Sequence, residues 1–134
     1  MEERPSGQKE NIKSRQAHEF GVFAEKITAE EYIKKGYVIL ERNWRMGKTE
    51  IDLIAQSNDT VIFIEVKARS GKDMEPIEAV TPDKKKRMTR AADSYIRNKE
   101  GEFSYRFDLV GVTGDMHNYS IEILEDAFLA ADFF

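Results

Sequence analysis

The charged residues Asp52, Glu65 and Lys67 lie in two segments of this 134-residue chain that are rich in apolar side chains. In the segment 60–68 (TVIFIEVKA), Glu65 and Lys67 are two residues apart, so on a β-strand both side chains leave the same face. The segment 49–55 (TEIDLIA) alternates in the same way and carries Asp52. The pattern predicts two strands, each with charges on one face.

A tight turn between these strands would bring the two carboxylates together. Asn58-Asp59 separates the two segments, and both residue types tolerate the left-handed backbone that such turns need. With these two residues in the turn, Ser57 pairs with Thr60. The same register places Asp52 directly across from Glu65.

Two carboxylates and one ammonium group on one face are suited to phosphodiester hydrolysis. Asp52 and Glu65 would hold a hard divalent cation, Mg²⁺ or Mn²⁺, through oxygen ligands, with water completing the shell. Lys67 would orient the attacking water and offset charge in the transition state. The same three residues are also typical of a solvated strand face with ordinary charge pairs, each worth about 0.2 to 1 kcal/mol.

Glu25 is the fourth candidate catalytic residue. Apolar and small side chains recur at three- and four-residue steps over 17–35, which predicts an amphipathic helix capped at Gly36. Glu25 lies at the border of its apolar stripe, so this helix could lower a third carboxylate toward the metal. A border Glu is also typical of a solvated helix face.

The remaining pattern predicts a second helix that begins at Thr81-Pro82 and ends near Lys99. The order is helix, three strands, helix, two strands, an α/β or α+β class with a mixed sheet flanked by helices. We expect one domain over 16–134, preceded by a flexible arm over 1–15. The domain is expected to end in a short apolar segment, 126–134. The expected strands are 37–43, 49–55, 60–68, 105–112 and 120–124, with a turn at 45–48.

Charge and composition narrow the classes of partner. The chain has no cysteine and no long apolar run, so we expect a soluble, cytoplasmic protein without thiol chemistry or a membrane partner. The net charge is −4, yet 34–90 holds thirteen Lys and Arg against nine Asp and Glu. This basic middle indicates a phosphate-contacting surface, although mixed charges are equally typical of a solvated face. The predicted nucleic-acid contacts are Arg45, Lys48, Arg69, Lys84, Lys85 and Arg87.

Several short motifs in combination resemble the uncharacterised bacterial YraN-like family over nearly the whole chain beyond the arm. That family is similar to the PD-(D/E)xK nuclease superfamily, and in particular to archaeal-type Holliday-junction resolvases. The motifs are Gly21, Ala24-Glu25, Gly36-Tyr37, Arg42–Arg45 (RNWR), Glu50–Ala55 (EIDLIA), Phe63–Arg69 (FIEVKAR) and Arg106–Asp108 (RFD).

The resemblance implies a restriction-endonuclease-like fold in which Glu25, Asp52, Glu65 and Lys67 occupy the superfamily's acidic and lysine positions. It further implies a Mg²⁺-dependent endonuclease acting on DNA rather than RNA, on branched DNA in repair or recombination. A symmetric homodimer and a helicase or recombination partner belong to the same expectation. The alternative is a non-catalytic nucleic-acid-binding accessory protein that keeps the fold, and a second is an interaction protein with no nucleic-acid role.

Overall fold

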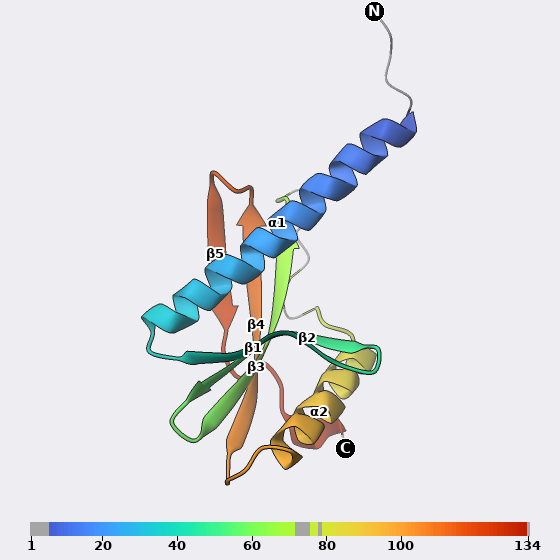
Figure 1. The fold of residues 1–134 in the computed structure, drawn as a ribbon. Helices are drawn as coiled ribbons and strands as arrows, with labels where there is room; N and C mark the ends of the chain where they lie inside the picture. The colour runs from blue at the N-terminus through green and yellow to red at the C-terminus, as the bar shows by residue number, and fades with distance from the viewer. Residues whose placement is uncertain (1–5, 72–75, 78, 134) are drawn as a thin grey trace, which may run out of the picture.

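The computed structural model describes residues 6–71, 76–77 and 79–133 as a five-stranded sheet with a long helix on each face (Figure 1). The predicted order of helix, three strands, helix and two strands is confirmed. A short 3-10 helix, η1, follows the last strand. The elements in chain order are α1 (Ser6–Lys34), β1 (Val38–Met46), β2 (Thr49–Ser57), β3 (Thr60–Arg69), α2 (Pro82–Arg97), β4 (Ser104–Gly114), β5 (Tyr119–Leu124) and η1 (Ala130–Phe133).

The strands lie side by side in chain order, β1-β2-β3-β4-β5. β3 and β4 are parallel, and α2 forms the crossover between them, whereas all other neighbours are antiparallel. The predicted α+β class with a mixed sheet between helices is therefore confirmed. The architecture is consistent with a restriction-endonuclease-like fold.

The β2–β3 hairpin has the predicted register. Ser57 pairs with Thr60, and the ladder continues to Leu53 opposite Ile64. Asn58 adopts the left-handed conformation, with φ of 52°, as the two-residue turn requires. The short turn thus fixes which side chains of the two strands meet.

Alternation along the central strands divides the core into two layers. Val61 and Phe63 of β3 pack on the α2 side, whereas Ile62 and Ile64 pack on the α1 side, and all four are fully buried. Each such side chain contributes about 1.5 to 3 kcal/mol on burial. Charged residues that continue β3 on the α2 side therefore emerge from a rigid, packed strand.

The largest differences from the predicted boundaries lie in two regions. α1 begins at Ser6 rather than at Ala17, so residues 6–15 of the expected arm are helical, while residues 1–5 lie outside the described part. Figure 1 shows this half of α1 projecting beyond the sheet, and residues 11–19 are exposed. The predicted turn over 45–48 is shorter, because only Gly47-Lys48 separate the paired Met46 and Thr49.

The predicted helix caps are confirmed. Gly36 has φ of +94° just after α1, where a residue without Cβ takes this conformation without strain. At α2, the Thr81 hydroxyl accepts the Lys84 N–H at 3.2 Å, and Pro82 opens the helix. Both helices therefore have defined ends beside the sheet.

A buried network anchors α1 to the sheet. The Tyr32 hydroxyl donates to Asp108 Oδ2 at 2.6 Å, and Arg106 Nε donates to Oδ1 at 3.0 Å. The backbone N–H of Asp126 also donates to Oδ1, so this fully buried carboxylate is satisfied from three segments. Tyr32 lies two helical turns after Glu25 on one side of α1, so the anchor also fixes the position of Glu25.

Candidate active site

The middle of β2 is distorted where Asp52 enters the site. Ile51 and Ile54 both pack in the α2-side core, although strict alternation would place them on opposite faces. Asn43, on the neighbouring part of β1, is left-handed with φ of 51°. The Asp52 carboxylate accepts the backbone N–H of Val66 from β3 at 2.8 Å. The Asp52 side chain thus connects β2 to β3 just beyond the last paired residues, Leu53 and Ile64.

Asp52 and Glu65 converge as the sequence predicts, although their backbones are not paired as expected. The ladder ends one step earlier, and the two carboxylates meet in side-chain hydrogen-bonding contact. Burial raises the pKa of Glu65 to about 7; the neighbouring Asp52 adds to the rise, and Lys84 opposes it. Burial raises the pKa of Asp52 as well, while the Val66 N–H and Lys84 act against the rise. The pair therefore stores electrostatic repulsion when both groups are ionised.

Glu25 of α1 joins this pair from the opposite layer. Its pKa is raised to about 6, first by burial and then by the charges of Asp52 and Glu50. Its side chain is in hydrogen-bonding contact with Asp52. Glu25 therefore lies beside Asp52, and the three carboxylates come from three elements, α1, β2 and β3.

Glu50 and Asn43 extend the site and had no assigned role in the sequence analysis. With its amide nitrogen turned toward them, Asn43 donates to Glu50 Oε1 at 3.0 Å and to Glu25 Oε2 at 3.1 Å. Glu50 also forms an ion pair with Arg45 at 3.1 Å. The even spacing of Glu50 and Asp52 on one strand was the sequence signal available for Glu50. For Asn43 no sequence pattern indicated the left-handed backbone conformation that accompanies its position in the site.

Glu65, Lys67 and Lys84 line a partly open cavity of about 220 Å³ between β3, β4 and the start of α2. Lys67 lies on the same face of β3 as Glu65, as predicted. Lys84 reaches from the first turn of α2 and forms an ion pair with Glu65. Lys84 is also one of the predicted nucleic-acid contacts, and the structure places its ammonium group against Glu65 of the acidic site.

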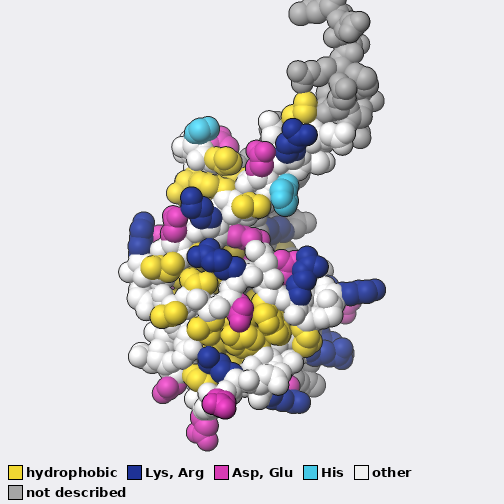
Figure 2. Space-filling view, in the orientation of Figure 1, with side chains coloured by type: hydrophobic (Ala, Val, Ile, Leu, Met, Phe, Trp, Pro, Cys, Tyr) yellow, Lys and Arg dark blue, Asp and Glu magenta, His cyan; other side chains and the backbone are white. Residues whose placement is uncertain are grey.

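The other predicted nucleic-acid contacts occupy different environments. Lys48 and Arg87 are exposed, Arg45 is exposed beside Glu50, and the Lys85 ammonium lies 5.5 Å from the centre of the Phe128 ring. Figure 2 shows basic side chains along the edge where Figure 1 places the β1–β2 turn and α2, interspersed with acidic ones.

Arg69 is a correction to the predicted surface. It is only 9% exposed, because its guanidinium packs over Gly111 on β4 beside Ile77. A side chain in this position packs against the sheet and does not present its charge to a nucleic acid. Alternation along β3 places Arg69 on the same face as Glu65 and Lys67, but this face is buried at Arg69.

The donor set fits a hard divalent cation. Within residues 6–71, 76–77 and 79–133, no three Asp, Glu, His or Cys side chains are arranged to hold a metal ion on their own. Mg²⁺ is usually bound by one or two carboxylates and several waters, so the Asp52 and Glu65 pair meets that requirement. Burial raises the pKa of both groups, so a positive charge there would stabilise their ionised forms.

A mixed sheet in which buried carboxylates converge beside two lysines defines the architecture of this acidic site. The model of "Uncharacterised protein family UPF0102" matches residues 24–112 of the chain, a range that contains every acidic and lysine residue of the site. The chain belongs to this family. The resemblance to YraN-like proteins drawn from the sequence motifs is thereby confirmed.

Individual relatives are similar over most of their length. A UPF0102 protein of Flavobacterium psychrophilum is 38% identical over 112 residues, which cover 83% of this chain and 94% of the relative. One of Bacteroides fragilis is 42% identical over 102 residues, covering 75% and 84%. One of Chlorobium chlorochromatii is 42% identical over 117 residues, covering 82% and 91%.

Among solved structures, that of Pyrococcus furiosus SfsA in complex with Ca²⁺ is similar with a TM-score of 0.35 and 15% sequence identity, covering 84% of this chain and 62% of that one. In the described part of the chain, no helix combines the length and the hydropathy needed to cross a membrane.

Proposed function

We propose that the protein is a metal-dependent nuclease that hydrolyses phosphodiester bonds in DNA, with branched DNA of repair or recombination as its substrate. The observation that carries the proposal is the buried contact between Asp52 and Glu65 beside two lysines. Ionising two buried, adjacent carboxylates is costly, and stable folds seldom retain such a pair without a functional reason. A divalent cation and an anionic phosphate would together compensate these charges.

Each residue has a distinct role in this proposal. Asp52 and Glu65 would hold Mg²⁺ or Mn²⁺, which when bound polarises the phosphoryl group and lowers the pKa of a bound water. Lys67 orients the attacking water and stabilises the charge that develops on the phosphoryl oxygens. Glu25, held by Asn43, positions Asp52 through their mutual contact and adds negative potential for the cation.

Exposed basic residues around the site support contact with the phosphate backbone. Arg45, Lys48 and Arg87 are exposed on β1, the β1–β2 turn and α2, where they can approach a phosphate backbone. Such contacts fix orientation and make binding sensitive to salt, but they do not read base sequence. A symmetric homodimer would supply two sites for the two strands of a junction.

The experiment is a cleavage assay with single-stranded, duplex, flap and four-way-junction DNA in Mg²⁺, Mn²⁺ or EDTA. The unmodified protein is expected to cleave only with a divalent cation, and Asp52→Asn is expected to be inactive. Asp59→Asn is the matched control, because Asp59 is an exposed residue of the β2–β3 turn. Equal cleavage by Asp52→Asn would refute the proposed site, and salt-sensitive binding of DNA without any cleavage would instead favour a binding protein.

A further inference from the structure

Lys84 differs from the other basic residues because its ammonium group lies on a candidate metal ligand. Its backbone is fixed in the first turn of α2 by the Thr81 cap. Its side chain crosses to β3 and forms an ion pair with Glu65. The Glu65 side chain is only 14% exposed, whereas that of Lys84 is 42% exposed. The lysine therefore contacts the buried carboxylate while a substantial part of its own side chain remains open to solvent.

The cavity provides a second position for this ammonium group. Lys84, Lys67 and Glu65 line the same space of about 220 Å³, which is open on one side. The rest of its lining is largely apolar, from the approach to α2 and from β4. A phosphate group entering this space would meet two ammonium groups and the N-terminal end of α2, which favours anions.

The contact with Glu65 and the binding of a divalent cation to Glu65 compete. Both use carboxylate oxygens of the same side chain, and two positive charges about 4 Å apart repel each other even in a solvated setting. Asp52 is affected as well, since the positive charge of Lys84 also favours the ionised form of its carboxylate. Binding of a cation at the acidic pair should therefore weaken the hold of Glu65 on Lys84.

We infer that Lys84 is an exchangeable counter-ion, which neutralises Glu65 in the metal-free protein and moves to a phosphate of the substrate when a divalent cation takes Glu65. This inference rests on the proposed function. Lys84 thus holds the Glu65 carboxylate before the cation binds and contacts the substrate afterwards. Lys67, two residues from Glu65 on the rigid strand, keeps its place throughout.

The first test is calorimetric titration with Ca²⁺ at pH 8.5. Lys84→Met is expected to bind Ca²⁺ about tenfold more tightly than the unmodified protein, because the competing charge is gone. Lys84→Arg should return the affinity toward the original value. Lys85→Met is the control, since it removes the same charge from the next residue of α2, which lies against Phe128. Equal affinities in Lys84→Met and Lys85→Met would overturn the inference.

The second test measures binding of a fluorescein-labelled four-way junction in EDTA and in Ca²⁺, with the DNA checked on a gel for integrity. Lys84→Met is expected to weaken binding about tenfold in Ca²⁺ and less than twofold in EDTA, where Lys84 is already held by Glu65. An equal loss in both conditions would assign Lys84 to a fixed phosphate contact and contradict the exchange.

The unmodified protein gives a readout that does not depend on the stability of any variant. In ¹⁵N-lysine NMR spectra, Ca²⁺ should shift the Lys84 Nζ signal more than that of Lys85. No shift of Lys84, in a protein that calorimetry shows to bind Ca²⁺, would refute the exchange while leaving the metal site in place. Absence of any Ca²⁺, Mg²⁺ or Mn²⁺ binding by the unmodified protein would instead refute the proposed function and the inference with it.

Discussion

Replacing Glu65 with Gln is expected to stabilise the metal-free protein at alkaline pH. Burial and the Asp52 charge raise the pKa of Glu65 from its ordinary value of 4.5 to about 7 in the folded state. The folded protein therefore binds a proton at Glu65 more tightly than the unfolded chain does. This contribution to stability is fully present below pH 4.5 and is lost as the pH rises through about 7.

The size of the effect follows from the displacement of the pKa. A rise of the pKa from 4.5 to about 7 corresponds, at roughly 1.4 kcal/mol for each pH unit, to about 3 to 4 kcal/mol over the full titration, of which about 2 to 3 kcal/mol falls between pH 5 and pH 8. The Glu65 side chain is only 14% exposed, so solvent screening removes little of it. The amide that Glu65→Gln introduces cannot ionise, although its oxygen can still accept a hydrogen bond from Lys84.

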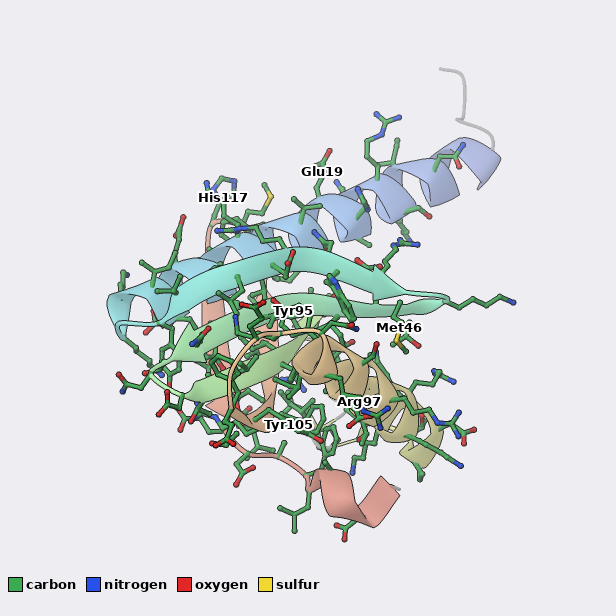
Figure 3. All side chains as sticks on the ribbon, turned by 60° about the horizontal axis from the view of Figure 1, so that its bottom comes forward. Glu19, Met46, Tyr95, Arg97, Tyr105 and His117 are labelled. Carbon is green, nitrogen blue, oxygen red and sulfur yellow. The ribbon has the colours of Figure 1, made fainter. Side chains whose placement is uncertain are left out.

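Urea unfolding in EDTA, followed by the fluorescence of Trp44, gives the free energies. Trp44 is the only tryptophan, and its ring packs edge-on against Tyr95, with centroids 5.2 Å apart. The difference between Glu65→Gln and the unmodified protein should increase by about 2 to 3 kcal/mol from pH 5 to pH 8. Glu19→Gln is the control, because Glu19 is exposed on the outer side of α1 (Figure 3). A difference that does not change with pH would refute the electrostatic account of the site.

Three further results are expected. Asp52→Asn should weaken Mg²⁺ binding at least about tenfold by calorimetry, whereas Lys67→Ala should retain or slightly strengthen it and still lose single-turnover cleavage; equal metal affinities in the two variants would contradict their assigned roles. Tyr32→Phe should lower the free energy of unfolding by about 1 to 3 kcal/mol in urea, because a buried carboxylate loses a hydrogen bond of 2.6 Å. Gly111→Ala should lower the free energy of unfolding by about 1 to 3 kcal/mol in the same assay, since its Cβ would lie 2.4 Å from Ile77 Cγ2. An unchanged midpoint would show that the neighbouring side chains move aside without cost.

The sheet hairpin was predictable because its causes are local. The turn at Asn58 sets the register of β2 and β3, and alternation then decides which face each side chain takes. The extension of α1 to Ser6 was not predictable in this way. Residues 11–19 are exposed and lack apolar periodicity, so that part of the helix has no packed face from which to infer it.

The candidate site was predictable only where one strand or one turn places its residues. Even spacing placed Glu65 and Lys67 on one face, and the hairpin added Asp52. The contact between Lys84 and Glu65 depends on how α2 crosses back over the sheet, which no local pattern specifies. Alternation along β3 predicted Arg69 as a surface residue, but alternation carries no information on its burial, which comes from packing over Gly111 beside Ile77.

A crystal of the unmodified protein soaked in Mn²⁺, with data collected at the manganese absorption edge, would test the central claim most directly. The account predicts one anomalous peak within about 2.5 Å of carboxylate oxygens of both Asp52 and Glu65. It also predicts that the peak is absent in Asp52→Asn under the same soak. A fully occupied peak elsewhere, or none at Mn²⁺ concentrations that support cleavage, would contradict the assignment of these two residues as the metal site.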